Sequence, residues 1–199
     1  MTHDMTMNTT TQAKHDHIFI DGSNLFIEGM RLSSHLREGL PSMPVYLHPA
    51  FDLDFRLDLR RLRGFLGAIG ADHRPLLVGS RSENSDLVFA SAEYCGYDTI
   101  VYDRDQQNRE KKVDATIVLR ALLAALDGTP ETARIVLVAG DSDYVPLVHE
   151  LRKRRYEVEV VFWSHASREL REAASRFVSL DPMIDALRYT PLSRPCAVA

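Results

Sequence analysis

Short apolar runs alternate along the chain with longer segments whose apolar residues recur at helical spacing. The runs are too short for helices and rich in β-branched residues, which is typical of strands buried on both faces of a parallel sheet. They lie at residues 18–20, 75–79, 97–103, 135–139, 157–163 and 177–180. This alternation predicts an α/β fold, a three-layer sandwich with a mostly parallel central sheet.

Helical spacing is clearest at residues 58–69, 85–95 and 112–126. In the second of these segments Leu87, Ala90 and Tyr94 are expected to point inward, and Gly96 is expected to end the helix.

The remaining segments predict loops and tails around one domain at residues 17–183. Residues 1–16 are polar, rich in Thr and without period, which predicts a disordered tail, and residues 184–199 are expected to form a C-terminal tail. Residues 31–57 contain Gly39 and three prolines and predict a long loop or insertion.

Composition narrows the class of protein. A chain of 199 residues that is 45% hydrophobic suits one α/β domain. It has no apolar run near the roughly 20 residues of a membrane span and no apolar centre of a signal peptide, so we expect a cytoplasmic protein without a membrane partner. Two cysteines without metal-ligand spacing argue against a disulfide framework or a zinc site. The net charge of −4 argues against coating nucleic acid by bulk electrostatics, but allows a local basic rim.

The apolar run at residues 135–139 ends in two carboxylates, Asp141 and Asp143. Gly140 allows a sharp turn there, and Ser142 or Asp143 can cap the following helix. Open α/β folds bind their ligands at this edge of the sheet. Asp in such a turn is often only a cap, but one cap needs one Asp. The case for a function therefore depends on whether other carboxylates reach the same edge.

Asp21 and Asp114 are the further carboxylates expected at this edge. Asp21 follows the first apolar run, and Ser23 or Asn24 could cap the next helix without it. Asp114 lies in the first turn of the helix at 112–126, where its simplest role is a helix-dipole interaction worth about 0.3–1 kcal/mol.

Four carboxylates that converge on one site need a cation, because like charges raise one another's pKa. The first strand is expected to be central, next to the strand that ends before Asp141, and the helix that carries Asp114 is expected to begin at the same edge. Oxygen ligands alone select Mg²⁺ or Mn²⁺ over zinc. The sequence therefore predicts a divalent metal site formed by Asp21, Asp114, Asp141 and Asp143.

At these positions the sequence resembles the NYN domains, the LabA-like branch of the PIN-like nucleases. The resemblance rests on FIDGSNL at 19–25, KKVD at 111–114 and VAGDSDYVPL at 138–147, in this order. It extends through shorter motifs at 78–81, 102–104 and 170–178, and covers roughly residues 17–183.

The resemblance implies a PIN-like fold and a metal-dependent ribonuclease that acts on RNA. It implies that Asp21, Asp114, Asp141 and Asp143 are catalytic metal ligands for Mg²⁺ or Mn²⁺. Asn24 belongs to the same catalytic set, and Ser23 and Ser142 support it. Attack by metal-activated water is expected to leave a 5′-phosphate.

Two other functions stay open. A binding or regulatory module could keep the fold and bind RNA with little chemistry. A phosphatase or response-regulator-like domain with an Asp nucleophile fits less well, because it needs one special Asp, whereas Asp141 and Asp143 are paired like ligands.

Basic residues near the acidic edge are candidates for binding RNA, which we expect to be single-stranded because a crevice at a strand edge admits one backbone more readily than a duplex. The candidates are Arg81, Arg104, Arg109, Lys111 and Lys112. An ordinary solvated loop explains the last two nearly as well. The oligomeric state, including a homo-oligomer, stays open.

Overall fold

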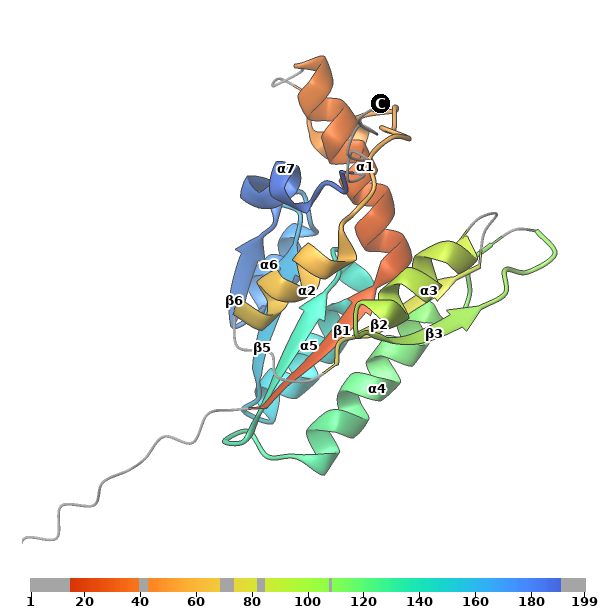
Figure 1. Ribbon diagram of the computed structural model, residues 1–199. Helices are drawn as coiled ribbons and strands as arrows, with labels where there is room; N and C mark the ends of the chain where they lie inside the picture. Colours follow the sequence, from red (N-terminus) through yellow and green to blue (C-terminus); the bar gives the residue numbers. More distant parts are fainter. Residues whose placement is uncertain (1–14, 40–42, 69–73, 82–84, 108, 191–199) are drawn as a thin grey trace, which may run out of the picture.

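The computed structural model describes residues 15–39, 43–68, 74–81, 85–107 and 109–190. Within these ranges the chain forms a six-stranded, entirely parallel sheet with the strand order β3-β2-β1-β4-β5-β6 (Figure 1). The strands are β1 (His15–Asp21), β2 (Leu76–Ser80), β3 (Asp98–Tyr102), β4 (Ala133–Val138), β5 (Glu157–Phe162) and β6 (Arg176–Ser179). The predicted α/β class and parallel sheet are confirmed.

Helices cover both faces of the sheet, and each face has its own apolar core (Figure 1). One core includes residues of α1 (Gly22–Glu38), α2 (Leu59–Ala68), α3 (Ser85–Tyr94) and α7 (Ile184–Leu187). The other includes residues of α4 (Val113–Asp127), α5 (Val145–Lys153) and α6 (Arg168–Ala173). Short 3₁₀ turns lie at η1 (Val45–Leu47), η2 (Ser142–Tyr144) and η3 (Asp181–Met183). None of the helices in the described ranges is long and apolar enough to cross a membrane.

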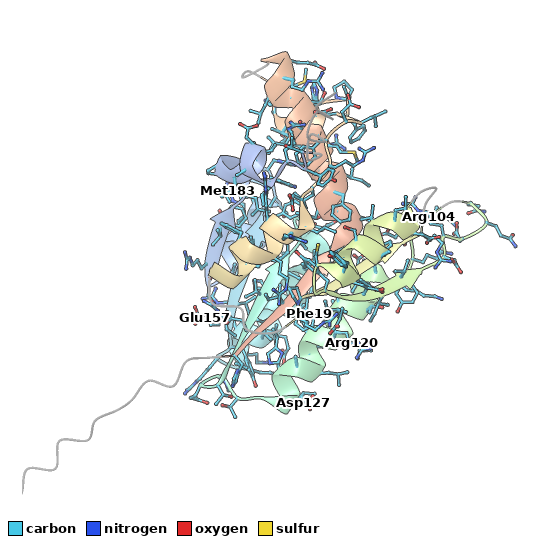
Figure 2. The ribbon with its side chains drawn as sticks, in the orientation of Figure 1. Phe19, Arg104, Arg120, Asp127, Glu157 and Met183 are labelled. Atoms are coloured by element: carbon cyan, nitrogen blue, oxygen red, sulfur yellow. The ribbon has the colours of Figure 1, made fainter. Side chains whose placement is uncertain are left out.

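The strand register determines where the acidic residues lie. Ile20 pairs with Val138, and Asp21 pairs with Val78, so the carboxyl ends of β1, β2 and β4 lie together. The strand order reverses direction at β1, which is where open sheets form a crevice. Figure 2 shows Arg104 toward this edge, and Asp127 and Glu157 toward the opposite edge.

Both ends of the domain differ from the prediction. The first strand begins at His15 rather than after residue 16, because Asp16 is buried and accepts hydrogen bonds of 2.8 and 2.5 Å from Arg134 of β4. The tail predicted at residues 1–16 otherwise lies outside the described residues. The prediction of a C-terminal tail from residue 184 is wrong for its first part, because α7 packs on the core and Tyr189 N donates to Arg56 O (2.7 Å).

The loop predicted at residues 31–57 is also shorter than expected. Helix α1 continues through Glu38 and ends at Gly39, whose φ of 62° lies in the left-handed region that favours glycine. The buried face of α1 holds Leu32 together with the small or polar residues Ser33, Ser34 and His35, which is why its helical period is weak in the sequence.

Helix α3 presents a different face to the core from the one predicted. Leu87, Ala90 and Tyr94 are exposed, whereas Phe89 and Ala92 are buried. Phe89 packs over Gly79 at the end of β2, where a Cβ would lie 2.9 Å from the Phe89 ring. Gly96 ends the helix as expected, with a φ of 88°.

Asp52 joins the loop before α2 to α1 and to the segment after α7. Its buried carboxylate accepts hydrogen bonds from Ser33 Oγ (2.6 Å), Arg37 Nη1 (2.8 Å) and Arg188 Nη1 (3.3 Å). Burial raises the pKa of Asp52, but these hydrogen bonds outweigh burial and lower the pKa to about 2. The loop is therefore held by a buried charge that three donors stabilise.

We predict that Asp52→Asn lowers the free energy of unfolding by about 2 kcal/mol at pH 7. The folded pKa lies below the ordinary value, so this contribution is present above about pH 4 and is lost as the pH falls toward about 2. Guanidinium unfolding measured across this window should show the difference between parent and variant shrinking. The exposed Asp54→Asn is the matched control and should change stability by less than about 0.5 kcal/mol. A difference that does not vary with pH would contradict this account.

Candidate functional site

Asp21 ends β1 and caps α1 at the same time. Its carboxylate is buried, with 4% of the residue exposed. Oδ1 accepts a hydrogen bond from the backbone N of Asn24 (3.0 Å), and Oδ2 accepts one from the hydroxyl of Tyr144 (2.9 Å). The expectation that Ser23 or Asn24 would cap this helix is wrong, because Asp21 is the N-cap. One oxygen caps the helix, and the other accepts a hydrogen bond from Tyr144.

The hydroxyl of Tyr144 connects Asp21 to Asp114. It lies 2.9 Å from Asp21 Oδ2 and 2.9 Å from Asp114 Oδ1, and thereby ties the end of β1 to the first turn of α4. Burial and the two neighbouring carboxylates raise the pKa of Tyr144, so this side chain remains a neutral donor. A single hydroxyl hydrogen cannot serve two carboxylates at once. The pair therefore carries negative charge that Tyr144 does not neutralise.

Burial also raises the pKa of Asp21 to about 6. Hydrogen bonds from Asn24 and Tyr144 lower the pKa, while the negative charges of Asp114 and Glu110 raise it further. Among the described residues, no cation is one of the causes that set this pKa, and a bound cation would lower it.

The turn after β4 is held against the first turn of α1. Asn24 Oδ1 accepts a hydrogen bond from Gly140 N (2.8 Å), and Asp141 Oδ1 accepts one from Asp143 N (3.1 Å). Gly140 is required for a different reason from the one predicted. It has no positive φ, but a Cβ at this position would lie 2.2 Å from the ring of Phe162. Close packing on β5 thus sets the position of Asp141.

These elements form an acidic pocket of about 340 Å³ at the carboxyl edge of the sheet. It is lined by three of the four predicted carboxylates, Asp21, Asp114 and Asp141, and by the predicted Ser23 and Asn24. The fourth carboxylate, Asp143, is exposed and is not among the lining residues, and Ser142 is exposed beside it. Two further carboxylates, Glu28 and Glu110, line the pocket.

Three residues at or beside the site, Glu28, Glu110 and Tyr144, are not predicted from the sequence. Glu28 lies seven residues after Asp21 along α1, a spacing that returns to the same helix face and was available as a signal. It is 2.9 Å from His165 Nε2. Glu110 accepts a hydrogen bond of 2.5 Å from Ser23 Oγ, although it belongs to a charged stretch without a period. Nothing in the sequence distinguishes Tyr144 from other core aromatics.

The five basic candidates lie in different environments. Only Arg104 lines the acidic pocket, with Nη2 3.9 Å from Glu110. Arg109 and Lys111 both pair with Asp105, at 3.0 and 3.1 Å.

The other two basic candidates are also engaged. Lys112 lies over the ring of Tyr102 at 5.5 Å, and Arg81 pairs with Asp86 at 3.0 Å. Among the five, Arg104 is thus the side chain that lines the acidic pocket.

The donor set suits a hard divalent cation. The pocket presents carboxylate, amide and hydroxyl oxygens, and no sulfur or imidazole lines it, which is the chemistry that Mg²⁺ and Mn²⁺ prefer. Across the part of the chain that the structure describes, no group of three or more His, Cys, Asp or Glu side chains is arranged so that it could hold a metal ion. The residues therefore fit the ion in chemistry and charge, while their side chains are not arranged as ligands.

An all-parallel α/β sandwich with an acidic pocket at the carboxyl edge of its central strands defines this chain as a Rossmann-like, PIN-like domain. The family model of the NYN domain matches residues 17–181, and the chain belongs to this family. NYN domains are part of the PIN-like nuclease superfamily. None of the curated proteins matches the sequence significantly.

We predict that Gly140→Ala destabilises the protein by about 1–3 kcal/mol, because the new methyl group overlaps the ring of Phe162. Gly64→Ala is the matched control. It lies within α2 with no atom near its Cβ, and should stabilise the protein by up to about 1 kcal/mol. Thermal or denaturant unfolding measures both changes. Equal effects of the two substitutions would contradict the packing argument.

We predict that Asp21 titrates with a pKa of about 6 in the protein kept in a chelator. Asp114→Asn removes a neighbouring negative charge and should lower this pKa, whereas Tyr144→Phe removes a hydrogen bond to the carboxylate and should raise it. Carboxyl-carbon NMR of the parent and both variants measures the shifts. Shifts of the same sign in both variants would contradict the assigned causes.

Proposed function

We propose that this chain is a ribonuclease that hydrolyses RNA phosphodiester bonds and requires Mg²⁺ or Mn²⁺. The observation that carries the proposal is the acidic pocket, where Asp21, Asp114 and Asp141 from three different elements line one space. Membership of the NYN family supports it, because the superfamily consists of nucleases. A purely structural role for these residues would not need three carboxylates on one pocket at the edge where open α/β sheets bind their ligands.

In the proposal, Asp21 Oδ2, Asp114 and Asp141 hold the cation, and Asp143 is an outer candidate beyond the pocket. A divalent ion bound there supplies Lewis acidity, which lowers the pKa of water and stabilises negative charge on a phosphate. Tyr144 orients two of the ligands through its hydroxyl.

Other side chains keep the carboxylates in place or meet the substrate. Asn24 fixes the turn that carries Asp141 through its bond to Gly140, and Ser23 positions Glu110. Ser142 lies beside Asp141, with Oγ 3.4 Å from its Oδ1. Arg104 is the proposed contact to the phosphate.

The proposed substrate is single-stranded RNA. Arg104 is the one basic candidate on the acidic pocket, and the overall charge of −4 provides little general attraction for nucleic acid. Binding by few charges favours a flexible strand that can bring one phosphate down to a recessed site.

A second candidate function is RNA binding with little chemistry. It is favoured by the side-chain arrangement, because no group of three potential ligands within the described ranges is set to hold an ion. The two functions differ in one result, which is metal-dependent cleavage by the parent protein.

We predict that Asp21→Asn and Asp141→Asn each lower the rate of RNA cleavage at least about 100-fold, because each removes ligand charge and preserves shape and capping. Asn24→Ala should lower the rate less. Asp143→Asn should also have a smaller effect than Asp141→Asn, since Asp143 does not line the pocket. Asp127→Asn, at the far end of α4, is the matched control and should retain the parental rate.

End-labelled RNA with Mg²⁺ or with EDTA provides the readout. The expected products carry a 5′-phosphate, and single strands should be cut faster than duplexes. A 2′,3′-cyclic phosphate would contradict the hydrolytic mechanism. Cleavage by Asp141→Asn at the parental rate would contradict the assignment of that residue, and no cleavage by the parent protein would favour the binding module.

A further inference from the structure

A second and larger pocket of about 630 Å³ adjoins the acidic pocket. The two pockets share Ser23, Ile27 and Arg104 as lining residues, so they open side by side along the first turns of α1. The larger pocket extends between α1, α3, the loop before α2 and the segment after α7. Its volume lies within the range of about 300–1,000 Å³ that small-ligand sites occupy.

Exposed apolar side chains gather at this pocket from four separate segments. Ile27, Leu53, Leu87 and Tyr189 all line it, and they are 38%, 71%, 76% and 52% exposed. Scattered exposed apolar residues are ordinary on a protein surface, but several that converge on one cavity mark a ligand site. Leu87 is one of the residues that the sequence predicts to be buried. In the structure it is exposed and forms part of the apolar lining of this pocket.

The wall that the loop before α2 forms is held firmly in place. Phe55 packs edge-on against Trp163 with ring centroids 6.4 Å apart, and the guanidinium of Arg188 lies 4.9 Å above the Phe55 ring. The carboxylate of Asp52 anchors the start of the same segment. A wall fixed in this way forms a site before the ligand arrives, which reduces the entropic cost of binding.

Two cations flank the apolar surface. Arg104 lies where the two pockets meet, and Arg56 lines the larger pocket while its guanidinium donates to the carbonyls of Leu53 and Phe55. A ligand that fits has an aromatic, largely apolar face and carries negative charge on either side. A nucleotide within a strand has these properties, because its base stacks on side chains and its phosphates pair with arginine.

We propose that this pocket binds one unpaired nucleobase of the RNA strand, at the nucleotide next to the phosphate held at the acidic pocket. The inference rests on the proposed function, since the acidic pocket determines where the strand lies. It also gives a physical reason for single-strand selectivity. A base in a duplex must be unstacked and unpaired before it can enter, whereas a base in a flexible strand enters at little cost. The loop before α2 and Tyr189 thus become substrate-recognition elements.

The test measures RNA binding rather than cleavage, so that it is independent of the chemistry. Asp141→Asn protein in Mg²⁺ is titrated with a fluorescent single-stranded RNA of about eight nucleotides and with a series in which each base in turn is replaced by an abasic site. One position should weaken binding roughly fivefold to a hundredfold when its base is removed, the range found for stacking of one base on an aromatic side chain.

Tyr189→Ala, made in the same Asp141→Asn protein, should weaken binding of the intact RNA to a similar extent. In this variant, intact RNA and the RNA abasic at that position should bind equally. Tyr189→Trp should restore the affinity for intact RNA and its dependence on that base. Tyr94→Ala is the matched control, because Tyr94 is an 82% exposed tyrosine that does not line the pocket, and it should change neither result.

The outcomes separate this inference from the proposed function. Equal weakening at every abasic position, an unchanged abasic pattern in Tyr189→Ala, or no RNA binding at all would overturn the base pocket. If the parent protein cleaves RNA but no abasic position weakens binding selectively, the proposed ribonuclease activity stands and the base pocket is wrong. If one abasic position weakens binding selectively but the parent protein does not cleave RNA, the base pocket stands and the proposed ribonuclease activity is wrong.

Discussion

Parallel pairing of β1 with β4 is the constraint on which the site depends. It brings the ends of two strands to one edge, where the chain leaves each strand through a turn capped by an Asp. Asn24 then joins the two turns by accepting a hydrogen bond from Gly140 N. Capping therefore does not exclude the proposed metal-binding role of Asp21 and Asp141. Capping uses Oδ1 of each residue, while Asp21 Oδ2 accepts a hydrogen bond from Tyr144.

Burial of Asp21 has an energetic consequence for the rest of the site. A buried carboxylate beside other carboxylates is costly unless a positive charge or a donor compensates it. Tyr144 supplies one hydroxyl for two carboxylates, and the guanidinium of Arg104 is near Glu110. In the proposed function, the remaining negative charge is what binds a cation and, through the cation, a phosphate.

The sequence predicts the fold well because the strands are strongly apolar and the order of elements fixes the topology. It predicts Asp21, Asp114 and Asp141 at one pocket for the same reason, since strand ends and helix starts are determined by that order. It does not predict Tyr144 or Glu110, whose positions depend on packing between distant elements. The sequence predicts Asp143 at the same site as Asp141, but Asp143 does not line the pocket, because a spacing of two residues in a 3₁₀ turn does not specify a common direction.

The loop before α2 shows a second limit of sequence reasoning. Its prolines and mixed polarity indicate a loop but not what the loop does. In the structure, the buried charge of Asp52 holds this segment against α1 and the residues after α7, so that Leu53, Phe55 and Tyr189 face a common pocket. Contacts between residues 52 and 188 have no local signature, and only the folded chain reveals them.

We propose that Asp21, Asp114 and Asp141 together hold a divalent ion. Anomalous X-ray scattering from crystals of the protein grown with Mn²⁺ can locate this ion without reference to activity. We expect one strong peak within about 2.0–2.5 Å of oxygens from at least two of these three carboxylates. This peak should disappear in Asp21→Asn crystals. A Mn²⁺ peak located elsewhere, with the three carboxylates free of metal at millimolar Mn²⁺, would rule out this metal site.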